Sequence, residues 1–278
     1  MSDEKFYEYS YGNFSIKLPV GHMLPAYQSI HPKYDRFLPH LVKYLANTDT
    51  VVDVGANVGD TLASMVMVKP CLNFICIEPD EFFYNVLKEN INIIKKSIID
   101  LRVDVVQALV GKTLTSVSLE GIGGTKHAVL DSKGSIKSIP LDDILSKQGS
   151  IKLIKTDTDG FDYDVLDSAM SAISYHSPMI FFECEYRHDY QLDGYRRTLK
   201  SLEEMGYSEW IIFDNFGEVV LRTNEITLVY QLMNYVWKQN LGHSTRTIYY
   251  FDILTAKKNY YHFISEVMSD YHRSTTAL

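Results

Sequence analysis

The segment VVDVGANVGD, residues 51–60, holds the residues whose types and spacing are best suited to chemistry. A strand that ends in Asp-x-Gly-x-x-x-Gly and turns into a helix brings bare backbone against a ligand, because Gly55 and Gly59 have no Cβ. Dinucleotide-binding folds carry a glycine where this chain has Asn57. Asp53, at the end of the strand, would repel a pyrophosphate but could bind the ammonium group of an amino acid. The segment therefore predicts a site for S-adenosylmethionine.

Two polar residues at the ends of the next two expected strands extend this site. Glu78 ends the run ICIE, where a carboxylate can accept hydrogen bonds from both ribose hydroxyls. Gln107 ends the following strand, where its side chain could reach the adenine edge. Either residue could instead be an ordinary turn residue. The full set of expected cofactor-binding residues is Asp53, Gly55, Asn57, Gly59, Glu78 and Gln107.

Four further polar residues could serve the transfer step. A sulfonium methyl is already activated, so the enzyme must align the accepting oxygen and help to remove its proton. Asp157 ends the fourth expected strand, and Glu183, Glu185 and His188 lie at or just after the end of the fifth. In a doubly wound sheet the ligand lies beyond the carboxyl ends of the strands. We expect Asp157, Glu185 and His188 to be the catalytic residues, with Asp157 as the first choice for the base.

The acids after the fourth strand have a second interpretation. Asp157, Asp159 and Asp162 could hold Mg²⁺ or Ca²⁺ through oxygen ligands. An EF-hand loop is excluded, because its twelfth position would be Ser168 instead of a glutamate. Zinc is disfavoured because no two Cys or His residues have the spacing of zinc ligands. We expect no bound metal.

The elements that position these residues follow from the hydrophobic pattern. From residue 50 onward, short apolar runs alternate with helical segments, which is typical of βαβ units on a parallel sheet. Helices are expected over residues 34–45, 60–68 and 80–94, as one helix after Phe161, before Gly206, near 224–240 and at the C-terminus. A hairpin is expected around the turn NFGE, with a last strand around residues 247–254.

Proline spacing divides the chain. Residues 1–48 contain four of the eight prolines, so they leave room only for short elements and are expected to form an N-terminal lobe or lid. Residues 49–278 are expected to form one Rossmann-like domain. A polar, glycine-containing stretch around residues 111–139 predicts a β-hairpin insert in that domain.

Composition limits the classes of partner. The 278 residues are 46% hydrophobic, which is enough for one large α/β domain with additions. With 27 basic and 35 acidic residues the net charge is −8, which disfavours nucleic acid as a partner. The three cysteines lie in or beside apolar runs and predict free thiols. No signal peptide or run of about 20 apolar residues is present, so we expect a cytoplasmic protein. Oligomeric state stays open.

The order of motifs resembles the FkbM-type family of S-adenosylmethionine-dependent methyltransferases. The resemblance rests on VVDVGANVGDT, ICIEPD, LDDIL, IKLIKTDTDGFDYDVL and FFECE, and it extends from about residue 50 to residue 185. One departure is the segment after the fourth strand, where Asp157, Asp159, Gly160 and Asp162 replace the family's usual Asp-x-Glu-Gly-x-Glu.

The resemblance implies a class I methyltransferase Rossmann-like fold. This is an α/β fold with a mostly parallel seven-stranded sheet, an antiparallel last strand and helices on both faces. It also implies methylation of a hydroxyl, often on a sugar of a glycan or a natural product. Two alternatives stay open, namely a nicotinamide-dependent Rossmann oxidoreductase and a catalytically silent nucleoside-binding subunit.

Overall fold

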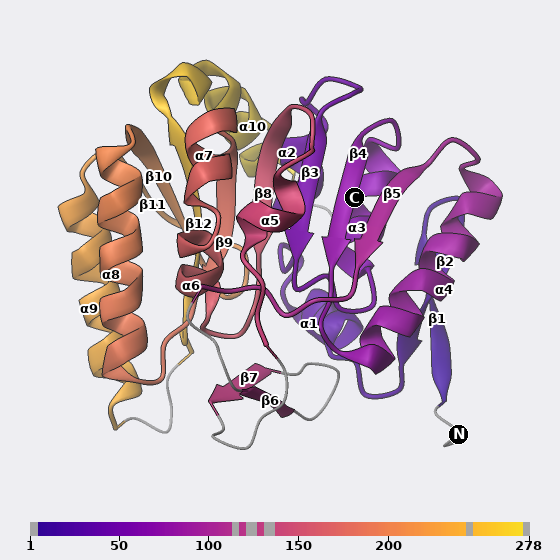
Figure 1. The fold of residues 1–278 in the computed structure, drawn as a ribbon, viewed down its shortest axis with the longest axis horizontal. Helices are drawn as coiled ribbons and strands as arrows, with labels where there is room; N and C mark the ends of the chain where they lie inside the picture. The colour runs from indigo at the N-terminus through magenta and orange to yellow at the C-terminus, as the bar shows by residue number, and fades with distance from the viewer. Residues whose placement is uncertain (1–4, 113–116, 121–126, 131–136, 243–246, 275–278) are drawn as a thin grey trace.

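The computed structural model describes residues 5–112, 117–120, 127–130, 137–242 and 247–274. Its centre is an eight-stranded sheet in the order β11-β10-β12-β9-β8-β3-β4-β5 (Figure 1). The strands are β3 (Thr50–Val54), β4 (Asn73–Ile77), β5 (Arg102–Val106), β8 (Ile151–Thr156), β9 (Met179–Cys184), β10 (Tyr207–Asp214), β11 (Val219–Thr223) and β12 (Phe251–Lys257). The strands from β5 to β9 pair in parallel, whereas β12 is antiparallel to both of its neighbours.

This arrangement confirms the expected class I methyltransferase fold, including the antiparallel last strand. The expected number of seven strands is wrong, because β11 adds an eighth at the edge. β11 pairs antiparallel with β10 after a tight turn in which Gly217 has a φ of +85°. The Asp214 carboxylate accepts hydrogen bonds from the backbone N–H groups of Phe216 and Glu218, both at 2.9 Å. The turn thus returns the chain along the free edge of β10.

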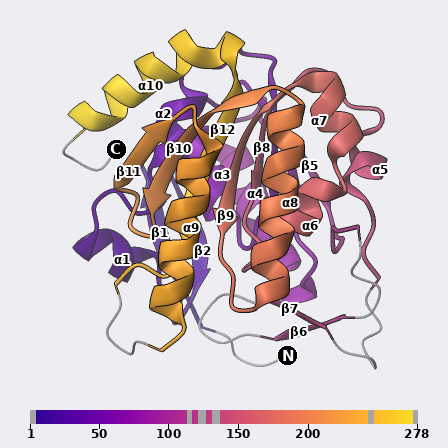
Figure 2. The same ribbon diagram turned by 90° about the vertical axis from the view of Figure 1, so that its left-hand side faces the viewer.

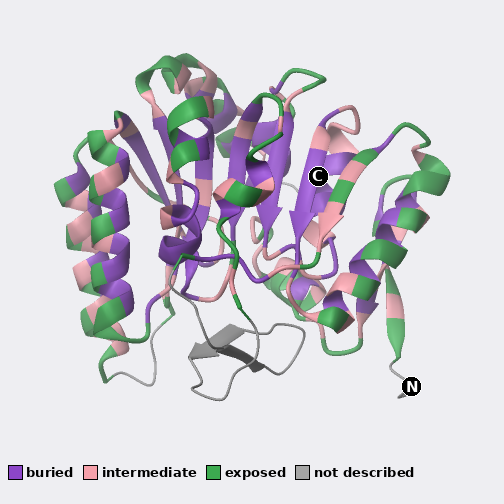
Figure 3. Ribbon diagram, in the orientation of Figure 1, coloured by how far each residue is buried: buried purple, intermediate pink, exposed green. Residues whose placement is uncertain are grey.

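Helices cover both faces of the sheet, and each face has its own hydrophobic core. One core includes residues of α2 (Phe37–Val42), α3 (Asp60–Val68), α4 (Glu81–Ser97) and α10 (Tyr261–Arg273), which follows a short 3₁₀ turn at Lys258–Tyr260. The other includes residues of α5 (Leu141–Leu145), α6 (Asp162–Asp167), α7 (Met170–His176), α8 (Asp189–Glu204) and α9 (Ile226–Asn240). Val51 and Val52 belong to opposite cores, since successive strand residues face opposite sides. Figure 2 shows α8 and α9 side by side, and Figure 3 shows the buried central strands.

Two expected helices are shorter than the apolar spacing indicates. The helix expected over residues 34–45 is α2, which begins at Phe37 because Asp35 is in the left-handed region with a φ of +54°. The single helix expected after Phe161 is divided into α6 and α7. The carbonyl oxygen of Ser168, at the break, accepts the N–H of Asp142 from α5. This hydrogen bond joins the segment between α6 and α7 to the start of α5.

Two hairpins and a short helix lie outside the main sheet. β1 (Phe6–Tyr11) and β2 (Phe14–Pro19) form an antiparallel hairpin that contacts α4, where the Asn90 side chain bonds both backbone groups of Lys17. α1 (Leu24–Ile30) follows, below the carboxyl ends of the parallel strands (Figure 1). β6 (Val117–Glu120) and β7 (His127–Leu130) pair antiparallel and lie beyond the same edge. The rest of the expected insert, at 113–116, 121–126 and 131–136, lies outside the described residues.

Two expectations from composition concern thiols and membranes. All three cysteines are free, as expected, and Cys76 and Cys184 are buried within strands. Among the described residues, no helix combines the length and the apolar character that crossing a membrane requires.

Candidate active site

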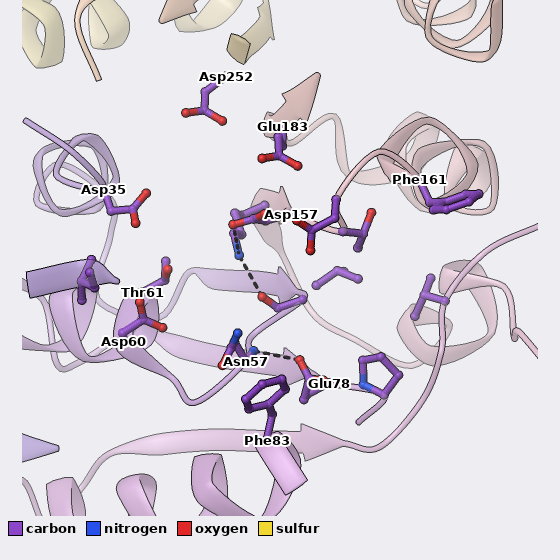
Figure 4. A pocket seen from close by; sticks show the side chains of 18 of the residues that line it. Asp35, Asn57, Asp60, Thr61, Glu78, Phe83, Asp157, Phe161, Glu183 and Asp252 are labelled. Carbon is purple, nitrogen blue, oxygen red and sulfur yellow. Dashed lines mark hydrogen bonds and ion pairs between the residues drawn. The ribbon is translucent and has the colours of Figure 1, made fainter. Parts of the chain in front are cut away.

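A cavity of about 400 Å³ lies at the carboxyl ends of the parallel strands (Figure 4). Ligand-binding cavities commonly measure roughly 300–1,000 Å³. Its lining includes residues from the ends of β3, β4, β8 and β9 and from the start of β12, which reaches this edge because it runs antiparallel. The N-terminal segment supplies His22, Met23, Leu24, Tyr27, Tyr34 and Asp35. The cavity therefore lies between the sheet and the first 48 residues.

The loop after β3 forms one wall of the cavity and needs three left-handed residues. Gly55, Asn57 and Gly59 have φ values of +77°, +47° and +85°. Glycine adopts this conformation freely, and asparagine is among the residues that tolerate it best. A Cβ on Gly55 would lie 1.9 Å from the backbone oxygen of Asp157, so no side chain fits there. The loop thus packs directly against the end of β8.

Glu78 is fixed in the wall next to this loop. Its Oε2 accepts the N–H of Asn57 at 2.9 Å, and its Oε1 accepts the N–H of Asp80 at 2.8 Å (Figure 4). Burial raises the pKa of Glu78 to about 7, although these two hydrogen bonds and Lys155 oppose the shift. Each carboxylate oxygen can accept a second hydrogen bond. Glu78 is therefore held in place with acceptor capacity left for a ligand in the cavity.

An apolar wall adjoins Glu78. It consists of Pro79 after β4, Phe83 on α4 and the segment Ala108–Val110 after β5. The Asp80 side chain caps α4 by accepting hydrogen bonds from the N–H groups of Phe82 and Phe83. A flat aromatic group could pack on this wall, beside the carboxylate.

A buried lysine that sequence reasoning missed lies beneath the loop. Lys155, on β8, is 4% exposed, and its Nζ lies 2.9 Å from Asp53 Oδ1 and 3.5 Å from Asp157 Oδ2. Its Nζ also donates a hydrogen bond to the Gly55 carbonyl oxygen at 3.1 Å. Burial disfavours the charged form of Lys155, but the Asp53 and Asp157 carboxylates outweigh it and raise its pKa. Lys155 therefore links the ends of β3 and β8 through charge.

Acidic side chains gather at the end of the cavity away from the apolar wall. The carboxylates that line this end are Asp35, Asp60, Asp157, Asp159, Glu183 and Asp252, and Figure 4 shows most of them. Burial and the neighbouring carboxylates raise the pKa of Asp159 to about 7, and the same causes hold the pKa values of Glu183 and Asp252 well above the ordinary range. Among the cavity-lining residues that the structure describes, Lys155 is the one Lys or Arg. The cavity is thus strongly acidic at this end.

The structure brings some of the expected site residues to the cavity and leaves others outside it. Gly55, Asn57, Glu78 and Asp157 line it, and Gly59 is in the adjoining loop. Asp53 is fully buried against Lys155, beneath the lining. Gln107 is exposed, and its successors Ala108–Val110 line the cavity in its place.

Neither of the two remaining catalytic candidates is among the described residues that line the cavity. Glu185 is paired with Arg187, whose Nη2 lies 3.1 Å from its Oε1. Carboxylate oxygens of Asp159, Glu183 and Glu185 lie within 4.8 Å of one another, which places Glu185 next to two acids of the lining. His188 is exposed at the start of α8, where its backbone N–H donates to Gln191.

The sequence carries a signal for Lys155 but none for three other residues of the cavity. A lysine between Ile154 and Thr156 in an otherwise apolar strand end was a usable signal, because a buried charge needs a partner. Tyr34, Asp35 and Asp252 carry no such signal, since only the packing of distant segments brings them to the cavity.

A family match decides which class of protein has this site. Residues 53–209, more than half of the chain, match the model of the methyltransferase FkbM domain. The chain belongs to the FkbM methyltransferase family. The matched region contains the β3 loop, Glu78, Lys155 and the acids at the ends of β8 and β9. A comparison with curated protein sequences gives no match.

Solved structures with a similar fold include several methyltransferases. The methyltransferase FkbM of Methylobacillus flagellatus KT is 16% identical with a TM-score of 0.42, over 84% of this chain and 58% of that one. An O-methyltransferase of Bacillus cereus, solved with SAH, is 13% identical with a TM-score of 0.47, over 84% of this chain and 89% of that one. A precorrin-6y C5,15-methyltransferase of Geobacter metallireducens GS-15 is 12% identical with a TM-score of 0.41, over 80% and 85%. Likenesses at this level do not identify the acceptor.

Proposed function

We propose that this FkbM-family protein transfers a methyl group from S-adenosylmethionine to a hydroxyl oxygen of a sugar, a glycan or a related small molecule. The observation that carries the proposal is the cavity with two distinct ends, in a chain of this family. One end has the apolar wall and the fixed carboxylate of Glu78, which suit a nucleoside. The other end has the acids around Asp157, which suit a cationic group and a polar acceptor.

The residues of the cavity fit the cofactor. S-Adenosylmethionine, when bound, supplies a methyl group on a positively charged sulfur, which makes the methyl reactive toward an oxygen. Glu78 would accept hydrogen bonds from the ribose hydroxyls, and Phe83 and Leu109 would pack against the base. The bare backbone at Gly55 would lie along the amino-acid portion. Asp53 would act indirectly, by holding Lys155 and the loop in place.

Asp157 is the residue that we propose as the base. Its side chain is half exposed, lines the cavity and ends β8, at the edge of the sheet where acceptor and methyl group would meet. The ammonium group of Lys155, 3.5 Å from its Oδ2, would fix the direction of the carboxylate. Asp157 would orient the acceptor hydroxyl and take its proton as the new bond forms. Glu185 and His188 are further from this role, because neither lines the cavity among the described residues.

We also propose that the N-terminal lobe, residues 1–48, acts as a lid over the Rossmann-like domain of residues 49–278. The support is that Met23, Tyr27, Tyr34 and Asp35 all line the cavity across from the sheet. A lid would keep water away from the reacting groups and complete the walls of the acceptor site.

The proposal is tested by methyl transfer from labelled S-adenosylmethionine to a panel of nucleotide sugars, oligosaccharides and glycolipids, followed by location of the label. We expect a methyl ether on a sugar oxygen and binding of S-adenosylhomocysteine in calorimetry. Label on nitrogen or carbon would contradict the proposed acceptor. Binding of NADH, with no binding of S-adenosylhomocysteine, would favour the oxidoreductase alternative.

The same assay tests the role of Asp157. We expect Asp157→Asn to lower kcat by about 10²- to 10⁴-fold, the usual range for losing a general base, while the affinity for S-adenosylhomocysteine stays nearly unchanged. Asp104→Asn, at an exposed position on β5, is the matched control and should retain full activity. A near wild-type kcat for Asp157→Asn would move the base to another acid of the cluster.

A further inference from the structure

Three carboxylates, two that line the cavity and one next to them, have the arrangement of a cation site. Asp159 follows β8, and Glu183 and Glu185 lie at and just beyond the end of β9, which pairs in parallel with β8. Glu183 and Glu185 are two positions apart, so an extended chain would direct both side chains to the same side. One oxygen from each of the three residues lies within 4.8 Å of the others. Ligands that bind one Ca²⁺ at about 2.3–2.6 Å can be as far apart as this.

Glu183 provides an independent sign that a ligand is missing. Its residue is 8% exposed, and its buried Oε2 has no hydrogen-bond partner among the described residues. A buried charged oxygen without a donor is strongly unfavourable. Figure 4 shows the Glu183 carboxylate directed into the cavity, close to Asp157 and on the side of Asp252. The neighbours that face Glu183 in the cavity are therefore mostly acids, and an ionised carboxylate cannot supply the missing donor.

Hydrogen bonds of one side chain hold together the segments that follow these acids. Gln191, on α8, accepts the backbone N–H groups of Arg187 and His188 through its Oε1, at 2.8 and 3.0 Å. Its Nε2 donates to the carbonyl oxygen of Gly160 at 3.0 Å. This buried amide therefore fixes the segment after Glu185 against the segment after Asp159. The three carboxylates come close together because of this connection, although each would repel the others when ionised.

We propose that Asp159, Glu183 and Glu185 bind one divalent cation at the acceptor end of the cavity. The ligands are carboxylate oxygens, with no sulfur or imidazole in the cluster, so the site suits Mg²⁺, Mn²⁺ or Ca²⁺. Arg187, which pairs with Glu185, has a side chain that is 51% exposed and can move outward when the cation binds. This proposal replaces the expectation from the sequence that no metal binds.

The use of the cation rests on the proposed function. Asp159 and Glu183 line the same cavity as Asp157, so a cation on them could also bind the acceptor hydroxyl. A metal-bound hydroxyl loses its proton more readily, which would assist Asp157 as the base. The binding site itself does not depend on this use and can be tested without an acceptor.

The test measures Mn²⁺ binding to the EDTA-treated 278-residue chain. Electron paramagnetic resonance detects the Mn²⁺ that stays free in solution. We expect one saturable site per chain that Mg²⁺ and Ca²⁺ compete for. Glu183→Gln and Asp159→Asn should each weaken Mn²⁺ binding by at least about tenfold. Substitution of residues that only support metal ligands already lowers metal affinity by about 10- to 100-fold. Asn tolerates the left-handed backbone of Asp159, whose φ is +52°, so this second variant should fold. Glu204→Gln, at an exposed site, is the matched control.

Two results would overturn the cation site. One is the absence of saturable binding up to roughly 1 mM Mn²⁺, the weak end of the range for protein sites of this kind. The other is equal affinity in the wild type, Glu183→Gln and Asp159→Asn. Calorimetry with S-adenosylhomocysteine on the same samples separates this outcome from failure of the proposed function. Cofactor binding without Mn²⁺ binding removes only the cation, whereas Mn²⁺ binding without cofactor binding removes the methyltransferase assignment of this cavity.

Discussion

At the scale of single residues, the cavity depends on two buried charged groups with opposite surroundings. Lys155 has carboxylates on two sides and the Gly55 carbonyl on a third, so its charge is compensated. Among the described residues, Glu78 accepts hydrogen bonds from two backbone N–H groups and forms no ion pair. A carboxylate that accepts one backbone hydrogen bond on each oxygen keeps lone pairs for a ligand, whereas an ammonium group whose N–H groups are all paired has no donor left for one. Glu78 therefore suits binding, and Lys155 suits positioning.

Glu78→Gln tests this distinction. A glutamine offers one oxygen where the native side chain offers two, so either Asn57 N–H or Asp80 N–H would face an NH₂ group. We expect the affinity for S-adenosylhomocysteine to fall by about 1.5–3 kcal/mol, the range for a hydrogen bond to a charged group. Isothermal titration calorimetry measures it directly. Glu81→Gln, three residues further along and exposed, is the control, and an unchanged Kd for Glu78→Gln would show that Glu78 only supports the turn.

At the scale of elements, the close contact between the β3 loop and the end of β8 determines the shape of the site. The N–H of Asp157 donates to the Val54 carbonyl oxygen at 3.0 Å, and the N–H groups of Gly55 and Ala56 both donate to the Ile77 carbonyl oxygen at 3.0 Å. The ends of β3, β4 and β8 are therefore joined by backbone hydrogen bonds. From the sequence, Gly55 was expected to let a ligand approach the backbone. In the structure, the atom closest to the position of a Cβ on Gly55 is the backbone oxygen of Asp157.

Gly55→Ala should therefore reduce stability even without ligand. The new methyl group would lie 1.9 Å from the Asp157 oxygen, and alanine at a φ of +77° adds about 1–2 kcal/mol of its own. We expect a loss of more than about 2 kcal/mol in the free energy of unfolding, measured by urea denaturation, and a lower kcat because Asp157 moves. Gly149→Ala, where no atom lies within 4 Å of the added Cβ, should stay within about 0.5 kcal/mol of the wild type. A Gly55→Ala protein as stable as the wild type would mean that the loop yields easily.

Most of the fold near the site could be predicted, because its elements follow local rules. The helix expected over residues 60–68 is α3 to the residue, since Gly59 starts it and Pro70 follows its end. The helix expected to begin at residue 80 is likewise present as α4, whose N-cap is Asp80. β11 could not be predicted as part of the sheet, because pairing with β10 depends on which edge is free. Asp157 and Glu183 could be related because parallel strands end at one edge of the sheet, but no local pattern relates Asp35 and Asp252 to that edge.

At the scale of the whole molecule, the site places several acids in surroundings that favour their protonated forms. Burial, together with the charge of Asp157, raises the pKa of Asp162 to about 7, and burial raises that of Glu78 to about 7 as well. Glu183 and Asp252 are shifted in the same direction. The folded protein without ligand is therefore expected to hold protons that the unfolded chain releases.

The thermal stability of the ligand-free, EDTA-treated protein should accordingly fall as the pH rises from 5 to 8. The stability that a raised carboxyl pKa contributes is complete below the unfolded value of roughly 4 and is lost as the pH passes through the folded value near 7. One pKa unit corresponds to about 1.4 kcal/mol, and Tm changes by roughly 2–4 °C per kcal/mol in chains of this size, so the shift at the fully buried Asp162 alone predicts a fall of several degrees. Differential scanning calorimetry across this range measures the fall in Tm.

Two controls test the origin of this fall. It should be smaller in Glu183→Gln, which removes one of the shifted acids. It should also be smaller when Mn²⁺ is added to the wild type, because a cation compensates the ionised forms. A Tm that rises from pH 5 to pH 8 would show that the acids at the cavity are ionised and compensated within the folded chain itself.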